Sequence, residues 1–190
     1  VTLNLPRIAL ESKGNKEEFW EIFKERLAIC KDALDYRAKR CGEAKPQNAP
    51  ILYMHGAFGK RLKADDRVKQ LFDNKRSTLS LGYIGLYEVA SVFYGGEWER
   101  NSEAKEFTLD IMRYMKECVD KWTAEGDYWY SIYSTPSESL TDRFCRMDTE
   151  KFGIVENITD KEYYTNSYHY DVRKNPTPFE KLDFEKDYPY

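Results

Sequence analysis

Strand patterns and helix patterns alternate along most of this chain. Strand-like runs occur at Val1–Leu5, Ser77–Gly85 and Tyr128–Tyr133, and apolar residues at helical spacing follow each of them. The first strand is expected to end at Pro6, and the aromatic third strand is expected to be buried. This alternation predicts an α/β fold with at least partly parallel strands and right-handed crossovers. In such a sheet, ligands bind where strands end and helices begin.

Apolar periodicity and capping residues predict the helices between these strands. One helix follows Asn15, carries an apolar stripe and stops at Gly42. A second spans Leu86–Tyr94 and is closed by two glycines, and a long third helix starts at Ser102. The basic segment Arg61–Arg76 is predicted to be a solvated helix that covers the fold.

The end of the third strand is followed by a helix start with unusual polar content. Thr135 is expected to be the N-cap, with Pro136 in the first helical position and Glu138 completing a capping box. Free N–H groups and the hydroxyls of Ser137 and Ser139 make this helix start a candidate phosphate site. On local pattern alone, a well-capped helix without a ligand is the simpler interpretation, because the Glu138 carboxylate would repel a phosphate.

Composition narrows the class of protein. The 190 residues are enough for one domain with a substantial core, and residues 1–190 are treated as a single domain, one that the ends of the chain indicate is partial. A formal charge of −3 argues against generic binding to nucleic acid or to a membrane surface. No apolar run approaches the roughly 20 residues of a membrane span, and no signal peptide is visible. A cytoplasmic location is expected.

The cysteines indicate neither a metal site nor a disulfide framework. The four residues, Cys30, Cys41, Cys118 and Cys145, lack the spacing of metal ligands. Buried, reduced thiols are expected, as is usual in the cytoplasm. With only two histidines in the chain, a histidine-rich metal site is not predicted either.

Both ends of the chain favour a piece of a longer protein. It begins without methionine in a strand pattern, and a strand in that position needs neighbours on both sides. It ends at Tyr190 without a helix or strand that would close the fold. The sheet is therefore expected to be incomplete, with Val1–Leu5 near an edge.

Four stretches carry a resemblance to a known family. They are Val1–Ala9 (VTLNLPRIA), Ser80–Glu88 (SLGYIGLYE), Ser134–Ser139 (STPSES) and Tyr164–His169 (YTNSYH). In this order they resemble the central catalytic region of the anaerobic, glycyl-radical ribonucleoside-triphosphate reductases. The resemblance covers nearly the whole chain, and the four stretches together are far more specific than any one of them.

The resemblance implies part of a ten-stranded α/β barrel, incomplete in this piece, from a homodimeric parent chain. It also implies a ribonucleoside triphosphate substrate, thiyl and glycyl radicals, formate as reductant, a structural zinc and an activating radical-SAM iron–sulfur protein. The radical cysteine, the radical glycine and the zinc ligands of the family fall outside these residues. The piece is therefore expected to hold no cofactor and no catalytic residue, and to be inactive alone, with Cys145 in the core.

The same resemblance implies a role for two groups of residues in substrate binding. The first holds the substrate phosphates at a helix start and comprises Thr135, Pro136, Ser137, Glu138 and Ser139. The second matches a recurring family motif and comprises Asn166, Ser167 and His169. For the second group, a loop that lines the pocket and a structural hydrogen-bonding corner are both open. The alternatives to an enzyme piece are a stand-alone phosphate-binding α/β module without catalysis and a purely structural domain.

Overall fold

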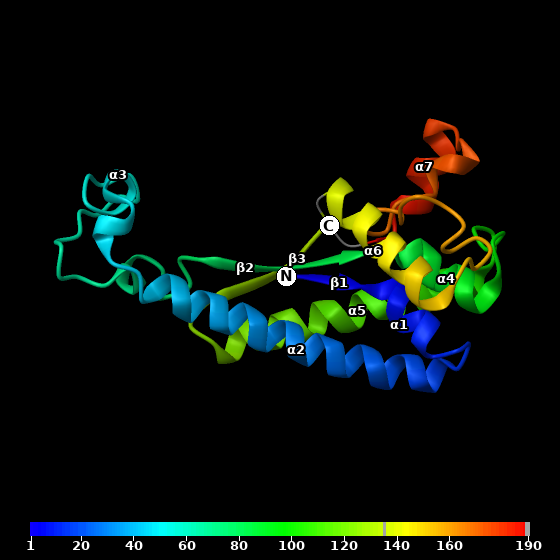
Figure 1. The fold of residues 1–190 in the computed structure, drawn as a ribbon, viewed down its shortest axis with the longest axis horizontal. Helices are drawn as coiled ribbons and strands as arrows, with labels where there is room; N and C mark the ends of the chain where they lie inside the picture. The colour runs from blue at the N-terminus through cyan, green and yellow to red at the C-terminus, as the bar shows by residue number, and fades with distance from the viewer. Residues whose placement is uncertain (135, 189–190) are drawn as a thin grey trace.

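The computed structural model describes residues 1–134 and 136–188. Its sheet has three parallel strands in the order β1-β2-β3, with bounds β1 (Thr2–Asn4), β2 (Thr78–Ile84) and β3 (Trp129–Tyr133). The predicted parallel α/β arrangement is confirmed, and β1 lies at an edge as expected (Figure 1). The register pairs Leu3 with Tyr83 and Ser80 with Ser131.

Two long helices cover one face of the sheet, and shorter helices gather at the end where the strands finish (Figure 1). The long helices are α2 (Lys16–Gly42) and α5 (Ser102–Glu125). The shorter ones are α1 (Leu5–Glu11), α4 (Leu86–Tyr94), α6 (Glu138–Phe152) and α7 (Pro178–Glu185). Leu81 and Tyr130 from the strands join Phe19, Phe23 and Ile111 from the two long helices in one hydrophobic core.

The other face of the sheet is polar and partly open. Because side chains alternate along a strand, the neighbours of these core residues point to the opposite face. That face carries Thr2, Ser80, Gly82 and Ser131 on the paired strands. Trp129 and Tyr133 of β3 are 52% and 56% exposed. The expectation of a buried third strand is therefore wrong for these two residues, because β3 is an edge strand and one of its faces is uncovered.

The first strand ends earlier than predicted. The side chain of Asn4 caps α1 and accepts a hydrogen bond from the Arg7 N–H at 3.2 Å. Pro6 therefore lies in the first turn of a helix, where its missing N–H costs nothing, and does not end a strand. Gly85 has a φ of +80°, and a Cβ there would lie 2.2 Å from Cγ of Pro6. Glycine thus lets the turn after β2 pack against α1.

The predicted helices at Asn15–Gly42, Leu86–Tyr94 and from Ser102 are all confirmed. The Asn15 side chain accepts the N–H of Glu18 at 3.0 Å, as expected of an N-cap.

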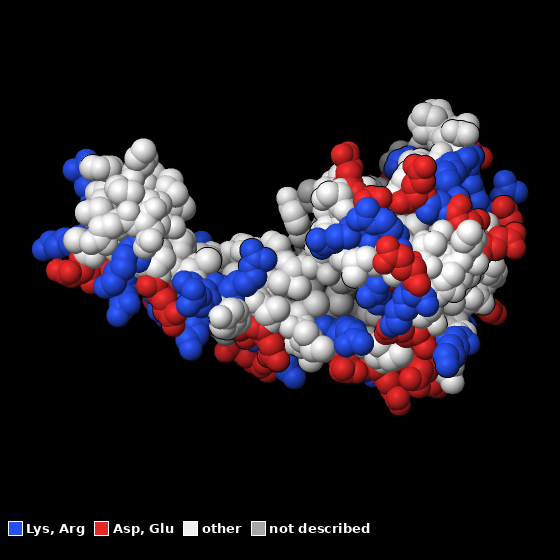
Figure 2. Space-filling view, viewed as in Figure 1, with Lys and Arg blue, Asp and Glu red and all other residues white. Residues whose placement is uncertain are grey.

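The predicted helix at Arg61–Arg76 is wrong. Within Arg61–Arg76, which the structure describes in full, the only helical element is the short 3-10 helix η2 (Val68–Leu71). The 3-10 helix η1 (Pro46–Asn48) and the four-residue helix α3 (Pro50–Tyr53) precede it. The Asp66 carboxylate accepts the Lys63 N–H at 2.7 Å, and such local bonds compete with a helix. The segment projects at one end of the molecule, and lysines and arginines lie along its outer edge (Figures 1 and 2).

The four cysteines are free thiols, but they are not all buried. Cys30 and Cys145 are buried and Cys118 is partly so, whereas Cys41 near the end of α2 is exposed, contrary to expectation. Burial raises the pKa of the Cys145 thiol to about 11, so this thiol is protonated and unreactive at neutral pH. Its place in the core agrees with the sequence prediction. None of the helices in the described residues combines the length and the apolar character of a membrane span.

Candidate functional site

The candidate site lies at the edge of the sheet where all three parallel strands end. The strands β1, β2 and β3 are followed along the chain by α1, α4 and α6 respectively, and the hydroxyls of Tyr83 and Ser134 lie 2.9 Å apart at this edge. A small cavity of about 160 Å³ opens beside them and is lined by Thr2, Gly82, Tyr83, Ile84, Tyr133, Pro136 and Ser137. The predicted strand-end location of the site therefore contains a cavity.

Helix α6 begins at Glu138, later than predicted. Its N-cap is Ser137, which makes no side-chain capping bond, and Pro136 precedes the helix. The expected capping box with Glu138 is therefore wrong, and the expected N-cap Thr135 lies outside the described residues. The physical reason is a long-range bond. The Asn166 side-chain oxygen accepts the Ser137 N–H at 2.9 Å and holds Ser137 in a non-helical conformation.

The start of α6 offers two backbone donors. The Ser137 carbonyl accepts the N–H groups of Leu140 and Thr141 at 2.9 and 3.0 Å. Within residues 1–134 and 136–188, no acceptor is found for the N–H groups of Glu138 and Ser139, and both residues are exposed. These two donors lie at the positive end of a 15-residue helix, which is an arrangement that binds anions. The Ser137 N–H is not a third donor for an anion, because it already donates to the Asn166 side chain.

The motif at 164–169 packs against the end of β2. Asn166 forms an antiparallel bridge with Ile84, and the carbonyls of Thr165 and Ser167 accept the N–H groups of Gly85 and Leu86 at 2.9 and 3.1 Å. We call residues 165–167 the Asn166 turn. It places one predicted residue, Asn166, directly against another, Ser137.

The other two residues of the motif lie elsewhere. Ser167 is fully buried with a φ of +48°, and its hydroxyl has no partner in the described part of the chain. His169 Nδ1 lies 3.1 Å from a carboxylate oxygen of Glu185 in α7. The structure therefore brings Asn166, and not His169, to the start of α6.

A buried ion pair contacts the first residue of the Asn166 turn, and the sequence analysis did not predict it. Glu88 in the first turn of α4 is fully buried and pairs with the ammonium group of Lys161, whose side chain is 4% exposed. The same Glu88 oxygen accepts the N–H and the hydroxyl of Thr165 at 2.9 and 2.8 Å. The available signal was a single charged residue in the largely apolar helix 86–94.

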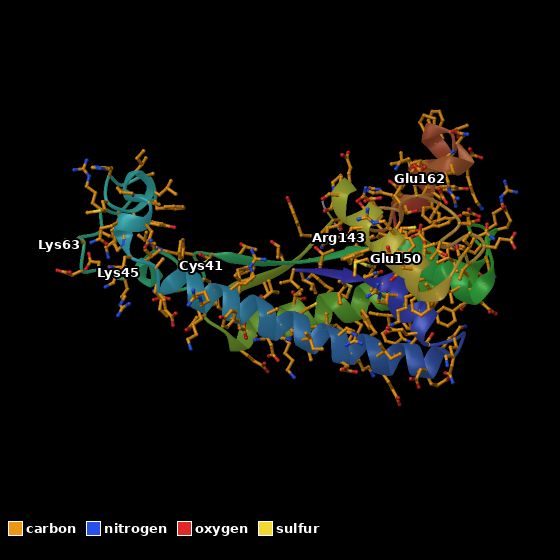
Figure 3. The ribbon with its side chains drawn as sticks, in the orientation of Figure 1. Cys41, Lys45, Lys63, Arg143, Glu150 and Glu162 are labelled. Carbon is orange, nitrogen blue, oxygen red and sulfur yellow. The ribbon has the colours of Figure 1, made fainter. Side chains whose placement is uncertain are left out.

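A second buried carboxylate links α6 to the end of β1. Asp148 is fully buried and accepts hydrogen bonds from Asn4 at 2.9 Å, from Arg7 at 2.5 Å and from the Tyr164 hydroxyl at 2.9 Å. Its position follows Thr141 and Cys145 on the buried face of α6. Asn4 and Tyr164 lie beside the edge where the strands end. The Asp148 carboxylate therefore bonds three segments to one another there: α6, the junction of β1 and α1, and the residue that precedes the Asn166 turn. Figure 3 labels the exposed residues Arg143 and Glu150 on the same helix, far from Lys45 and Lys63 at the other end of the molecule.

Acid is expected to destabilise the loop that carries the Asn166 turn. Burial raises the pKa of Asp171, but hydrogen bonds from Arg173 and the charge of Lys161 outweigh burial and lower this pKa to about 2, from an ordinary value of 3.8. The ionised carboxylate therefore stabilises the fold above pH 4, and this contribution of about 2 kcal/mol is lost as the pH falls from 4 to 2. Asp171→Asn should remove that part of the pH dependence, which is measured by urea unfolding at pH 4 and at pH 2. If the variant loses as much free energy of unfolding between these pH values as the parent protein, the prediction is contradicted.

The comparisons with known proteins agree on one family. A family model described as anaerobic ribonucleoside-triphosphate reductase matches residues 1–190. Proteins called anaerobic ribonucleoside-triphosphate reductase from Haemophilus influenzae and Escherichia coli are 54% and 49% identical over 190 residues. Each alignment covers 100% of this chain and 27% of the relative, so the chain spans about a quarter of the length of these relatives.

Solved structures show the same fold. The anaerobic ribonucleotide reductase from Thermotoga maritima with citrate in the active site superposes with a TM-score of 0.76 at 24% identity, covering 96% of this chain and 31% of that one. Its complex with dATP and CTP gives a TM-score of 0.75 at 24% identity, covering 96% and 29%. The expected partial α/β barrel is therefore confirmed.

Proposed function

This chain belongs to the anaerobic ribonucleoside-triphosphate reductase family, and we propose that it supplies the substrate-phosphate site of a longer enzyme. That enzyme reduces ribonucleoside triphosphates to deoxyribonucleotides by radical chemistry. The role of this piece is to bind and orient the substrate. The proposal extends to a homodimeric, cytoplasmic parent protein and a radical-SAM activating partner.

The free donors at the start of α6 carry this proposal. Phosphate oxygens would accept the N–H groups of Glu138 and Ser139 and the Ser139 hydroxyl, at the positive end of the helix dipole. Glu138 is exposed, so its carboxylate can point into solvent and away from the anion. Asn166 contributes by fixing Ser137, the N-cap residue that directly precedes the two residues that carry these donors.

The cavity beside Ser137 supports the same orientation. Its lining continues from Pro136 and Ser137 to Thr2 and Gly82 on the uncovered face of the sheet. A nucleoside attached to phosphates at α6 would therefore extend over that face, next to Tyr133. Ligands of parallel α/β sheets bind at this end of the strands.

The implied radical and metal groups do not fit the residues of this piece. In the described part of the chain, no three His, Cys, Asp or Glu side chains are grouped so that they could hold a metal ion. The buried Cys145 thiol donates to the Lys161 carbonyl at 3.0 Å, inside the core and not at the cavity. We therefore assign the glycyl radical, the formate chemistry and the zinc to other parts of the parent enzyme and derive no step through them.

Ser139→Ala in the full-length enzyme tests the proposal. Loss of one hydrogen bond to a charged phosphate costs about 1.5 kcal/mol or more, so the KM for the ribonucleoside triphosphate should rise about tenfold. Ser102→Ala is the matched control, because Ser102 is also exposed in the first turn of a helix, α5, away from the site. Steady-state kinetics of both variants decide the outcome. Equal KM values for the two variants would count against the site.

A further inference from the structure

We infer that Glu88 is a positioning residue that holds the start of α6 through the Asn166 turn. In this inference the Glu88–Lys161 pair fixes Thr165, Thr165 fixes the turn, and Asn166 then fixes the Ser137 N–H. The effect on substrate rests on the proposed function. The effect on Ser137 itself does not.

The first link is the crowding of donors around one carboxylate oxygen. Oε1 of Glu88 accepts the Thr165 N–H, the Thr165 hydroxyl and the Lys161 ammonium group. All three residues are buried or nearly so, with the Lys161 side chain 4% exposed. The burial of a carboxylate must be compensated by charge and hydrogen bonds, and here all of them meet Oε1, since Oε2 has no partner among the described residues. The position of Oε1 is therefore tightly fixed.

The second link joins Thr165 to the end of β2. Glu88 lies in the first turn of α4, only four residues after Ile84, and the Thr165 carbonyl accepts the Gly85 N–H. The Asn166 turn is therefore bonded to one short segment from two sides, by the backbone at Gly85 and by the side chain of Glu88. This double attachment fixes the turn relative to the sheet.

The third link reaches the candidate site. Asn166 follows Thr165 directly, and its side-chain oxygen accepts the Ser137 N–H from 29 residues away. The same loop is also bonded to α6 itself, since the Tyr164 N–H donates to the Thr141 carbonyl at 3.2 Å. Displacement of Thr165 would therefore release Ser137 and shift the donors of Glu138 and Ser139.

If the ion pair only stabilised the fold, two double variants that both remove its charges would affect the Asn166 turn equally. A positioning role predicts different effects. Glu88→Leu/Lys161→Met replaces the pair by apolar side chains of similar size and leaves the Thr165 N–H without its acceptor. It also removes the contact of Lys161 with Asp171 at 3.4 Å, a loss that both double variants share. Glu88→Gln/Lys161→Met also removes both charges but keeps an amide oxygen for Thr165. Only the first should loosen the Asn166 turn.

Amide hydrogen exchange in the full-length protein, resolved to single residues, is the direct readout. Exchange of the Ser137 N–H should be at least tenfold faster in Glu88→Leu/Lys161→Met and within about 1.5-fold of the parent protein in Glu88→Gln/Lys161→Met. Asn166→Ala is the positive control, because it removes the acceptor of that N–H outright. Lys174→Met is the negative control, since it breaks the pairs of Lys174 with Glu97 and Glu99, and in the described part of the chain these three residues form no hydrogen bond or ion pair with residues 165–167.

One result would overturn the inference. If Ser137 exchange is unchanged in Glu88→Leu/Lys161→Met while Asn166→Ala accelerates it, Glu88 does not position the turn. Should the double variant fail to fold, as judged by lost protection in α5, Thr165→Val replaces it. That variant removes only the hydroxyl bond to Glu88 and should accelerate Ser137 exchange about threefold, and no acceleration would again overturn the inference.

Substrate kinetics of the same variants test the link to function. We expect the KM for the ribonucleoside triphosphate to rise about tenfold in Glu88→Leu/Lys161→Met, with kcat within about threefold, and to be restored in Glu88→Gln/Lys161→Met. If the proposed phosphate site is wrong, Ser139→Ala leaves KM unchanged, yet Ser137 exchange still responds to Glu88. The two failures are therefore distinguishable.

Discussion

Ser139→Asp in the full-length enzyme is expected to raise the KM for the ribonucleoside triphosphate at least a hundredfold, with the melting temperature unchanged. The substitution removes a hydrogen-bond donor to phosphate, which costs about 1.5 kcal/mol or more, and adds a repulsion of about 1.5 kcal/mol or more, between the values for two charges in bulk water and near a protein surface. Together these exceed about 2.7 kcal/mol, which corresponds to about a hundredfold in affinity. Direct binding of the triphosphate, measured beside thermal unfolding, checks the prediction.

The unchanged melting temperature is the informative half of this prediction. An aspartate in the first turn of an ordinary helix interacts favourably with the helix dipole, so it does not weaken α6. Ser102→Asp in the first turn of α5 is the control and should change neither quantity. If Ser139→Asp also leaves affinity unchanged, the phosphates bind elsewhere and α6 is a plain capped helix.

Local sequence rules predicted the parts of the fold that local interactions determine. Helix α2 begins at the N-cap Asn15, and α4 ends at Tyr94 before two glycines, as the sequence indicated. The parallel arrangement followed from strand and helix alternation. At the two helix ends the deciding contacts lie within one turn of the residue concerned, which is the range that sequence patterns report.

The start of α6 could not be predicted in this way. The stretch from Thr135 to Glu138 has the pattern of a capping box, yet the helix begins at Glu138. The deciding contact is the bond from Ser137 to Asn166, which is 29 residues distant in sequence. A local rule has no access to that bond, so tertiary structure overrides the pattern.

The candidate site was only partly predictable for the same reason. Its location and Asn166 came from strand ends and from a family resemblance, while Glu88 and Asp148 were missed. Glu88 meets Thr165 across 77 residues, and Asp148 meets Asn4 across 144. A carboxylate on a buried helical face is the sole local sign of such networks, and its partners emerge only once the chain is folded.

Asp148→Ala should be the most destabilising single substitution that we consider, with a loss of about 3 kcal/mol or more in the free energy of unfolding. The fully buried carboxylate forms a pair with Arg7 at 2.5 Å, and it also accepts from Asn4 and from Tyr164, whose side chain is fully buried. Its removal leaves the Arg7 charge without its partner and two polar groups without their acceptor. Urea unfolding followed by tryptophan fluorescence measures the loss.

Asp110→Ala is the matched control for that substitution, because Asp110 also pairs with an arginine, Arg113, at 2.5 Å, but on the exposed face of α5. Exposed pairs of this kind contribute between about 0 and 1 kcal/mol, so the control should scarcely change stability.

Joint replacement of Arg7 and Asp148 by leucine should cost less than Asp148→Ala alone, since no charge is then left unpaired. Equal losses for Asp148→Ala and Asp110→Ala would contradict the role of the buried network, because burial is what separates the two pairs. If the network does hold Asn4 and Tyr164 at the ends of the strands, Asp148→Ala should also raise the KM for substrate, whereas Asp110→Ala should not.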